Sequence, residues 1–180
     1  MVGQRRDIEL VSFYLSTQDR LMPRLAKRLG RLFGLDTEVH AIGFDPEVSF
    51  DPHRGQYSSR GLLAELLQDR PHAYRILGVT SVDLYMPVLS FVFGEAQLKG
   101  RAAIVSIHRL RGEVYGLRPN RRALESRLAK EAIHELGHTF GLLHCLENRC
   151  VMSRSTYVED IDIKSDRFCG DCSAALRAFE

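Results

Sequence analysis

The sequence predicts a mixed α/β protein of the α+β class, in which helices cover a sheet that contains both parallel and antiparallel strands. Two observations predict it. Apolar segments of strand length alternate with segments whose apolar residues recur every three or four positions, in the order βαβαβββα. Three strands follow one another before the last helix, and short turns between strands require antiparallel neighbours. The chain has 180 residues, 44% of them hydrophobic, and no linker or repeat divides it, so we expect a single domain over residues 1–180.

The first strand is expected over residues 8–15, and Ser16 and Asp19 are placed as a capping box for the helix that follows. Leucines at helical spacing predict an amphipathic helix over residues 21–33, which Gly34 ends. The polar face of this helix is basic. We expect it to be a solvated outer face, and contact with an anionic partner is the alternative. Its basic residues are Arg20, Arg24, Lys27, Arg28 and Arg31.

The middle of the chain supplies the remaining strands and one more helix. A second strand is expected over residues 38–44, before an irregular stretch (45–57) with two Asp-Pro steps. Clustered leucines predict a helix over residues 59–68. The last three strands are expected over residues 73–85, 89–93 and, after a turn at Lys99-Gly100, 102–108.

A long helix is expected from Asn120 to about Gly141, with an apolar residue at every fourth position from Leu124 to Phe140. His134 and His138 are one turn apart, and each lies two residues, about 200° of rotation, from that apolar stripe. The two imidazoles therefore project from the opposite face. Such a helix should lie in the middle of the molecule, with its histidines in a cleft between layers.

Two histidines one turn apart can bind one metal ion, and Glu135 between them can take a proton from water that the metal activates. A third ligand is available in His144, because Gly141 can adopt a conformation that ends the helix and swings the chain back. The alternatives are histidines that bind no metal, and a metal site that supports binding or stability without turnover.

The pattern His134-Glu-x-x-His138-x-x-Gly141-x-x-His144 resembles the signature of the metzincins, a group of zinc metallopeptidases. The resemblance implies that the three histidines bind a catalytic zinc and that Glu135 is the general base. It also implies that Met152, the only methionine after the motif, forms a hydrophobic floor in a tight turn beneath the metal.

Four cysteines lie in the last fifth of the chain, and the last two have the Cys-x-x-Cys spacing. In a reducing compartment such a cluster favours a closed, structural metal site, and disulfides or redox-active thiols are the alternative. The combined pattern is similar to that of the archaemetzincin family, and the similarity extends upstream to segments 56–57, 78–85, 93–96 and 109–110. It implies a second zinc bound by Cys145, Cys150, Cys169 and Cys172.

The resemblance implies a metzincin-like twisted mixed sheet with an antiparallel edge strand, a central zinc-binding helix and a small zinc-stabilised C-terminal segment. Residues 1–143 would hold the sheet, the helices and the active-site helix. Residues 144–180 would hold the third histidine, the methionine turn and the cysteine site. Two zinc ions per chain are expected, one catalytic and one structural.

We therefore expect a zinc metallopeptidase whose peptide or protein substrate binds extended along an edge strand within residues 89–96. The rival hypotheses are a zinc-stabilised peptide-binding module and a hydrolase of non-peptide amides. Tyr157 is five residues from Met152, a spacing unlike that of a transition-state donor, so we expect a surface or packing role. The other histidines, which lack local metal-ligand partners, are expected to be ordinary: His40, His53, His72 and His108.

The net charge and the absence of targeting signals limit which partners and which cellular location we expect. A formal net charge of +2 gives no reason to expect a nucleic-acid partner. No apolar run approaches the length needed to span a bilayer, and the charged N-terminus is no secretory signal. The expectation is a cytoplasmic monomer with no membrane partner.

Overall fold

The computed structural model describes residues 6–15 and 20–179, so the expected capping box of Ser16 and Asp19 lies outside the described residues. The helices are α1 (Leu21–Phe33), α2 (Ser59–Asp69), α3 (Arg121–Thr139), α4 (Val158–Ile163) and α5 (Gly170–Phe179), with short 3-10 helices at Pro46–Ser49 and Gly112–Tyr115. The strands are β1 (Asp7–Phe13), β2 (Asp36–Ala41), β3 (Phe50–Asp51), β4 (Gln56–Ser58), β5 (Arg75–Thr80), β6 (Leu84–Tyr85), β7 (Gly94–Ala96) and β8 (Ala102–Ser106).

The main sheet has the strand order β2-β1-β5-β8-β7. Its first four strands are parallel, and β7 pairs with β8 in the antiparallel direction at the sheet's edge, with Glu95 opposite Ile104. This confirms the expected mixed sheet with an antiparallel edge strand.

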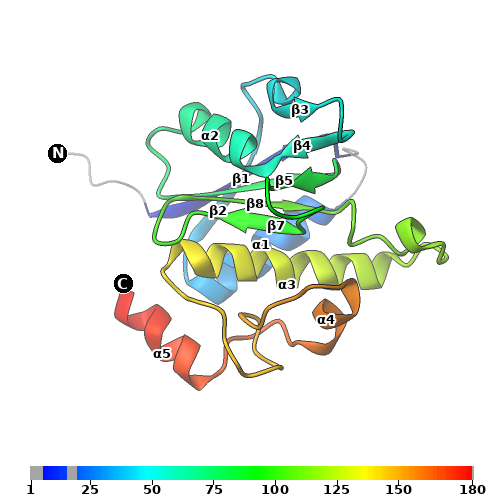
Figure 1. The fold of residues 1–180 in the computed structure, drawn as a ribbon. Helices are drawn as coiled ribbons and strands as arrows, with labels where there is room; N and C mark the ends of the chain where they lie inside the picture. Colours follow the sequence, from blue (N-terminus) through cyan, green and yellow to red (C-terminus); the bar gives the residue numbers. More distant parts are fainter. Residues whose placement is uncertain (1–5, 16–19, 180) are drawn as a thin grey trace.

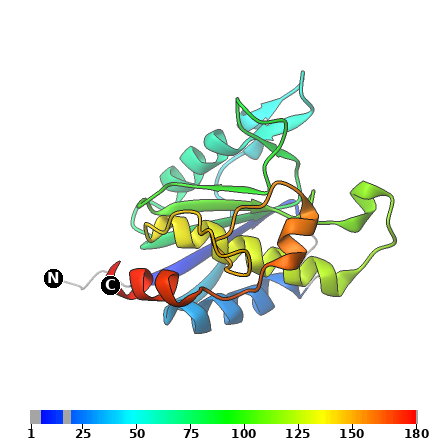
Figure 2. The ribbon, with the colours of Figure 1, turned by 60° about the horizontal axis from the view of Figure 1, so that its bottom comes forward.

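Helix α2 covers one face of the main sheet, and α1 and α3 lie side by side on the other face (Figures 1 and 2). Side chains along β8 alternate between two apolar clusters: Ala103 and Val105 contact the α1 and α3 side, and Ile104 contacts the α2 side. The segment that carries α4 and α5 lies on the side of α3 away from the sheet (Figure 1). Helix α3 is therefore central, as its histidine face predicts.

Polar residues of α3 bind this C-terminal segment. Arg127 makes a bidentate ion pair with Asp162, with N–O distances of 2.8 and 2.6 Å. Lys130 Nζ donates to the carbonyl oxygen of Ile161 at 2.8 Å. Residues 127–137 of α3 are consequently buried on every side, whereas the sequence predicted one apolar face only.

Two strand predictions were wrong beyond small shifts of their ends. The expected strand over 73–85 is two strands in different sheets, because the chain bends after Thr80 and β6 joins a small second sheet of order β3-β4-β6. That second sheet also occupies part of the stretch expected to be irregular. Residues 89–93 form no regular strand. Val92 makes only an isolated antiparallel bridge with Leu84, and side chains bind the carbonyls of Leu89 and Ser90; the edge strand is β7.

The C-terminal helices were not expected, and they are short: α4 has six residues and α5 has ten. Segments of this length carry too little periodicity to stand out. In the part of the chain that the structure describes, no helix is long and apolar enough to cross a membrane.

Candidate metal centre and active-site cleft

The last two turns of α3 present His134 and His138 to the same space. Nδ1 of His134 lies 2.8 Å from the carbonyl oxygen of Val151, and Nδ1 of His138 lies 2.7 Å from that of Leu142. A carbonyl oxygen only accepts hydrogen bonds, so each Nδ1 must carry the proton. In the neutral imidazoles both Nε2 atoms are then free to bind a metal, and the carbonyls fix the orientation of the rings.

Gly141 brings the third histidine to this space. Its φ of +83° is left-handed, and the helix ends with hydrogen bonds from Gly141 N to the oxygen of His138 (2.9 Å) and from Leu142 N to that of Gly137 (3.0 Å). These two bonds form a Schellman motif, which turns the chain out of the helix. His144 then lies with its ring centroid 5.3 Å from that of His134 and 5.0 Å from that of His138.

The three side chains fit a metal ion. One ring nitrogen from each lies within 4.8 Å of the other two. The Nε2 atoms of His134 and His138 are only 3.1 Å apart, although both are acceptors when the rings are neutral. Burial lowers the pKa of all three imidazoles, of His134 most strongly, which favours the neutral, metal-binding form. Three histidine nitrogens with an open fourth position are typical of catalytic zinc sites.

Glu135 lies between this centre and the edge strand. Its side chain packs against Gly94 of β7 so closely that a Cβ at Gly94 would be 2.7 Å from Glu135 Cγ and 2.9 Å from Oε1. A Cβ there would also lie 2.6 Å from the backbone oxygen of Ile104, so only glycine fits between β8 and the Glu135 side chain. Burial, and secondly the charge of Glu131, raise the pKa of Glu135 well above its usual value, and Lys164 acts in the opposite direction.

Met152 is fully buried beneath α3, where its Sδ would lie 2.5 Å from a Cβ added to Gly137. The preceding residue, Val151, supplies the carbonyl that orients His134. The methionine turn therefore contacts the helix at the glycine between the two histidines. The floor beneath a metal that the metzincin resemblance implies for Met152 stays a prediction.

Replacing Gly137 with alanine should force Met152 out of this contact. Overpacking of this kind costs about 1–3 kcal/mol, so we expect a lower free energy of unfolding and weaker metal binding. Urea unfolding and metal titration would measure both. In a double-mutant cycle with Met152→Ala, the double variant should lose less stability than the sum of the two single variants. Strict additivity would contradict the contact.

The four cysteines form a second cluster, next to the first. Their sulfur atoms all lie within 4.8 Å of one another, and all four cysteines are free. Backbone N–H groups of Glu147 and Cys169 lie 3.4 and 3.3 Å from the sulfurs of Cys145 and Cys150. Cys145 N also donates to the carbonyl oxygen of Met152 at 2.9 Å, so the two clusters share a loop.

Comparison with known proteins identifies the family of the chain. A family model described as peptidase family M54 matches residues 47–178. The archaemetzincin of Methanocaldococcus jannaschii is 43% identical over 161 residues, which cover 88% of this chain and 87% of that protein.

This chain belongs to peptidase family M54, the archaemetzincins. It is therefore a zinc metallopeptidase by family.

Solved structures of the family agree with the fold. The crystal structure of archaemetzincin from Methanopyrus kandleri superposes with a TM-score of 0.86 at 36% identity and covers 99% of this chain and 97% of its own. A structure described as a zinc-dependent peptidase from Methanocorpusculum labreanum gives a TM-score of 0.83 at 32% identity, covering 94% of this chain and 99% of its own.

In this archaemetzincin, the three histidines and Glu135 lie in a cleft of about 580 Å³. One wall is the loop 86–93 with β7, where Phe91 and Phe93 pack edge to face, 5.4 Å between ring centroids. The opposite wall consists of residues 154–156. Tyr157 is 67% exposed and does not line the cleft, as the sequence predicted.

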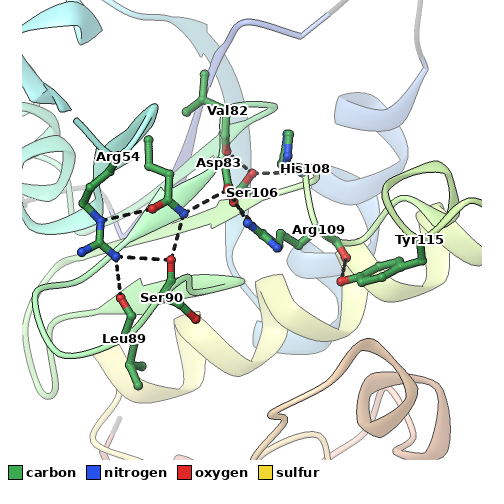
Figure 3. A network of polar contacts seen from close by, with 10 residues as sticks. Arg54, Val82, Asp83, Leu89, Ser90, Ser106, His108, Arg109 and Tyr115 are labelled. Atoms are coloured by element: carbon green, nitrogen blue, oxygen red, sulfur yellow. Dashed lines mark hydrogen bonds and ion pairs between the residues drawn. The ribbon is translucent and has the colours of Figure 1, made fainter. Parts of the chain in front are cut away.

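Side chains from three separate segments bind one another and the loop that carries the aromatic wall; Figure 3 shows the polar part of this network. Arg109 makes a bidentate ion pair with Asp83 (2.8 and 2.6 Å), and its guanidinium lies 4.4 Å from the ring centroid of Phe91. Gln56 Nε2 donates to Asp83 (3.0 Å) and to the carbonyl oxygen of Ser90 (2.9 Å). We call Gln56, Asp83 and Arg109 the wall clamp.

Arg54 extends the wall clamp. Its guanidinium donates to Gln56 Oε1 at 3.2 Å and to the carbonyl oxygen of Leu89 at 2.9 Å (Figure 3). The archaemetzincin resemblance extends to the segments that contain Gln56, Asp83 and Arg109. Nothing in the spacing of these residues indicated that they hold a wall of the cleft.

The wall clamp predicts an acid-sensitive contribution to stability. Burial would raise the pKa of Asp83, but hydrogen bonds from Arg109 and Gln56 outweigh it and hold the pKa below the usual value. A carboxyl whose pKa is lower in the folded chain stabilises the fold at pH values above its pKa in the unfolded chain, about 3.9. This stabilisation is lost as the pH falls through the pKa of the folded chain. Asp83→Asn should therefore cost about 2 kcal/mol near neutral pH and progressively less below about pH 4.

Urea unfolding of both proteins at each pH would measure this difference. Any effect of acid on the metal sites is common to both proteins, so the difference between them isolates Asp83. A difference that does not change with pH would contradict the ion pair's role.

Sequence reasoning missed one buried ion pair beside the cleft. Lys164 Nζ lies 2.8 Å from Glu131 Oε1, with the two side chains 1% and 4% exposed, and it donates to the carbonyl oxygen of Ser153 at 3.2 Å. Glu131 lines the cleft one turn before Glu135. No motif or periodicity links these residues, so the sequence carried no signal for them. Within the described ranges, no other histidine joins a cluster able to hold a metal.

Proposed function

We propose that this chain hydrolyses a peptide bond of a substrate bound extended along β7, with Glu135 as the general base. The observation that carries the proposal is the position of the Glu135 carboxylate, packed against Gly94 of the edge strand and next to His134 in sequence. A peptide added to an open strand edge uses main-chain hydrogen bonds. Its backbone would then run past both the carboxylate and the histidine cluster.

His134, His138 and His144 would hold the catalytic zinc, and the four cysteines would hold a structural one. Zinc bound by three histidines would supply Lewis acidity, which lowers the pKa of water to near neutrality. Glu135 takes the proton of the attacking water and delivers it to the leaving amine. The wall formed by Phe91 and Phe93 contacts a substrate side chain and excludes water from one side of the cleft.

The experiment that tests the proposal is mass spectrometry of an unbiased peptide library incubated with the zinc-loaded protein. Cleavage supports the proposal and reveals the sequence preference. Intact peptides with two zinc ions confirmed per chain would contradict it. If the protein then retained peptides without cutting them, it would be a peptide-binding module. If it cleaved non-peptide amides, it would be a hydrolase of that class.

The wall clamp gives the proposal a second test. Gln56→Glu removes the amide donor that binds Ser90 and Asp83 while it keeps an acceptor for Arg54. Because Gln56 positions the wall and does not touch the metal centre, we expect KM to rise about fivefold to tenfold with kcat and zinc content retained. Gln68→Glu, the same change on an exposed position of α2, is the matched control. A fall in kcat at unchanged KM would contradict a positioning role.

A further inference from the structure

A second hollow, of about 880 Å³, lies outside the cleft. The residues that line it come from α1, α3 and the segment 166–173. Helix α3 separates it from the active site: Ser126, Ala129 and Ile133 line this hollow, whereas His134 and His138 line the cleft. The peptidase reaction does not account for it.

The floor of this hollow is apolar and belongs to the main core. Leu25, Leu128 and Ile133 are buried members of the cluster between the helices and the sheet, and Leu32 and Phe168 pack against it with part of their surface exposed. The apolar side chains that a ligand in the hollow could contact are therefore mainly Leu32 and Phe168, above a closed, well-packed floor.

The rim is strongly basic. Arg24 pairs with Glu125 at 2.8 Å, and Arg28 pairs with Asp166. The remaining rim cations make no ion pair with any described residue, and all of them are exposed: Lys27, Arg31, Arg122 and Arg167. These four rim cations have no opposite charge paired with them. Together they carry more positive charge than the whole chain has as its net charge, which is +2. A solvated helix face would show similar charges, but it would not surround a recessed apolar floor.

We propose that this basic groove binds an acidic amphipathic helix of a partner protein. Leucine-like side chains at helical spacing would fill the floor, and flanking aspartates and glutamates would pair with the four rim cations. A single-stranded nucleic acid fits less well, because it needs exposed aromatic rings for base stacking and would leave the apolar floor uncovered. A lipid surface is too flat to reach a floor recessed between two helices.

The test uses the full-length, zinc-loaded protein and a labelled peptide with leucine and glutamate at helical spacing. We expect saturable binding by fluorescence anisotropy that weakens as salt rises. A scrambled peptide of the same composition should bind at least about tenfold more weakly, since it presents no apolar stripe. Lys27→Glu, Arg31→Glu and Arg122→Glu combined should reduce the affinity by about tenfold or more.

The charge-matched control combines Arg118→Glu, Arg149→Glu and Arg177→Glu, three exposed positions that do not line the groove. It should retain binding. Equal losses in the two triple variants, or equal binding of the scrambled peptide, would overturn the proposal as non-specific charge attraction. Binding of a polyuridine oligonucleotide or of phosphatidylserine-containing vesicles, without binding of the amphipathic peptide, would assign the groove to a different partner class and also overturn it.

Discussion

Glu135→Gln is expected to abolish peptide hydrolysis while both metal sites keep their ions. Glutamine has nearly the same shape and can still pack against Gly94, but it cannot accept the proton of the attacking water. Removing a general base costs about a hundredfold to ten-thousandfold in rate. The Nε2 atoms of His134 and His138 are unaffected, because their orientation depends on backbone carbonyls and not on Glu135.

The measurement combines peptide turnover with metal analysis of the purified variant. Glu113→Gln, the same substitution at an exposed position outside the cleft, is the control and should match the wild-type rate. Turnover that survives in Glu135→Gln would assign the proton to another group. Zinc loss in parallel with activity would instead show that Glu135 maintains the metal site.

Cys169→Ser is expected to have the largest effect on stability. Structural zinc in zinc-finger peptides binds with an apparent free energy of about 10–16 kcal/mol near neutral pH, and that energy is coupled to folding. One ligand fewer should remove the structural ion and lower the free energy of unfolding by several kcal/mol. The loss should extend to the histidine centre, because Cys145 follows His144 and donates to the carbonyl of Met152.

Metal content and urea unfolding, each with and without chelator, would measure both effects. Leu146→Ser changes a 99% exposed residue of the same loop to serine and should leave both readouts unchanged. Two results would contradict a structural metal site: wild-type protein that holds no zinc at the cysteines, and a variant that retains full stability. Either result would favour redox-active thiols.

The histidine centre could be predicted because its geometry is local. His134, His138 and His144 lie within eleven residues, and one helix plus one left-handed glycine bring them together. The cysteine cluster depends on the tertiary structure, because Cys169 lies nineteen positions after Cys150 and only the folded chain brings their sulfurs together.

The strand boundaries show where local signals fail. Residues 73–85 read as one apolar strand, but the chain bends after Thr80 and enters a second sheet. Residues 89–93 have strand-like composition, yet Arg54 and Gln56 bind the carbonyls of Leu89 and Ser90 from more than thirty positions away. Short strands have little periodicity of their own, so tertiary contacts decide their limits.

The sequence by itself predicted the kind of chemistry: the histidine cluster, the adjacent carboxylate, the turn at Gly141 and the mixed sheet with an antiparallel edge strand. These follow from helix geometry, glycine's freedom and strand order, which depend on near neighbours in the chain. Only the tertiary structure decided what surrounds that chemistry. The wall clamp, the Glu131–Lys164 pair and the basic groove each join side chains from distant segments, and their energies depend on burial that no local pattern encodes.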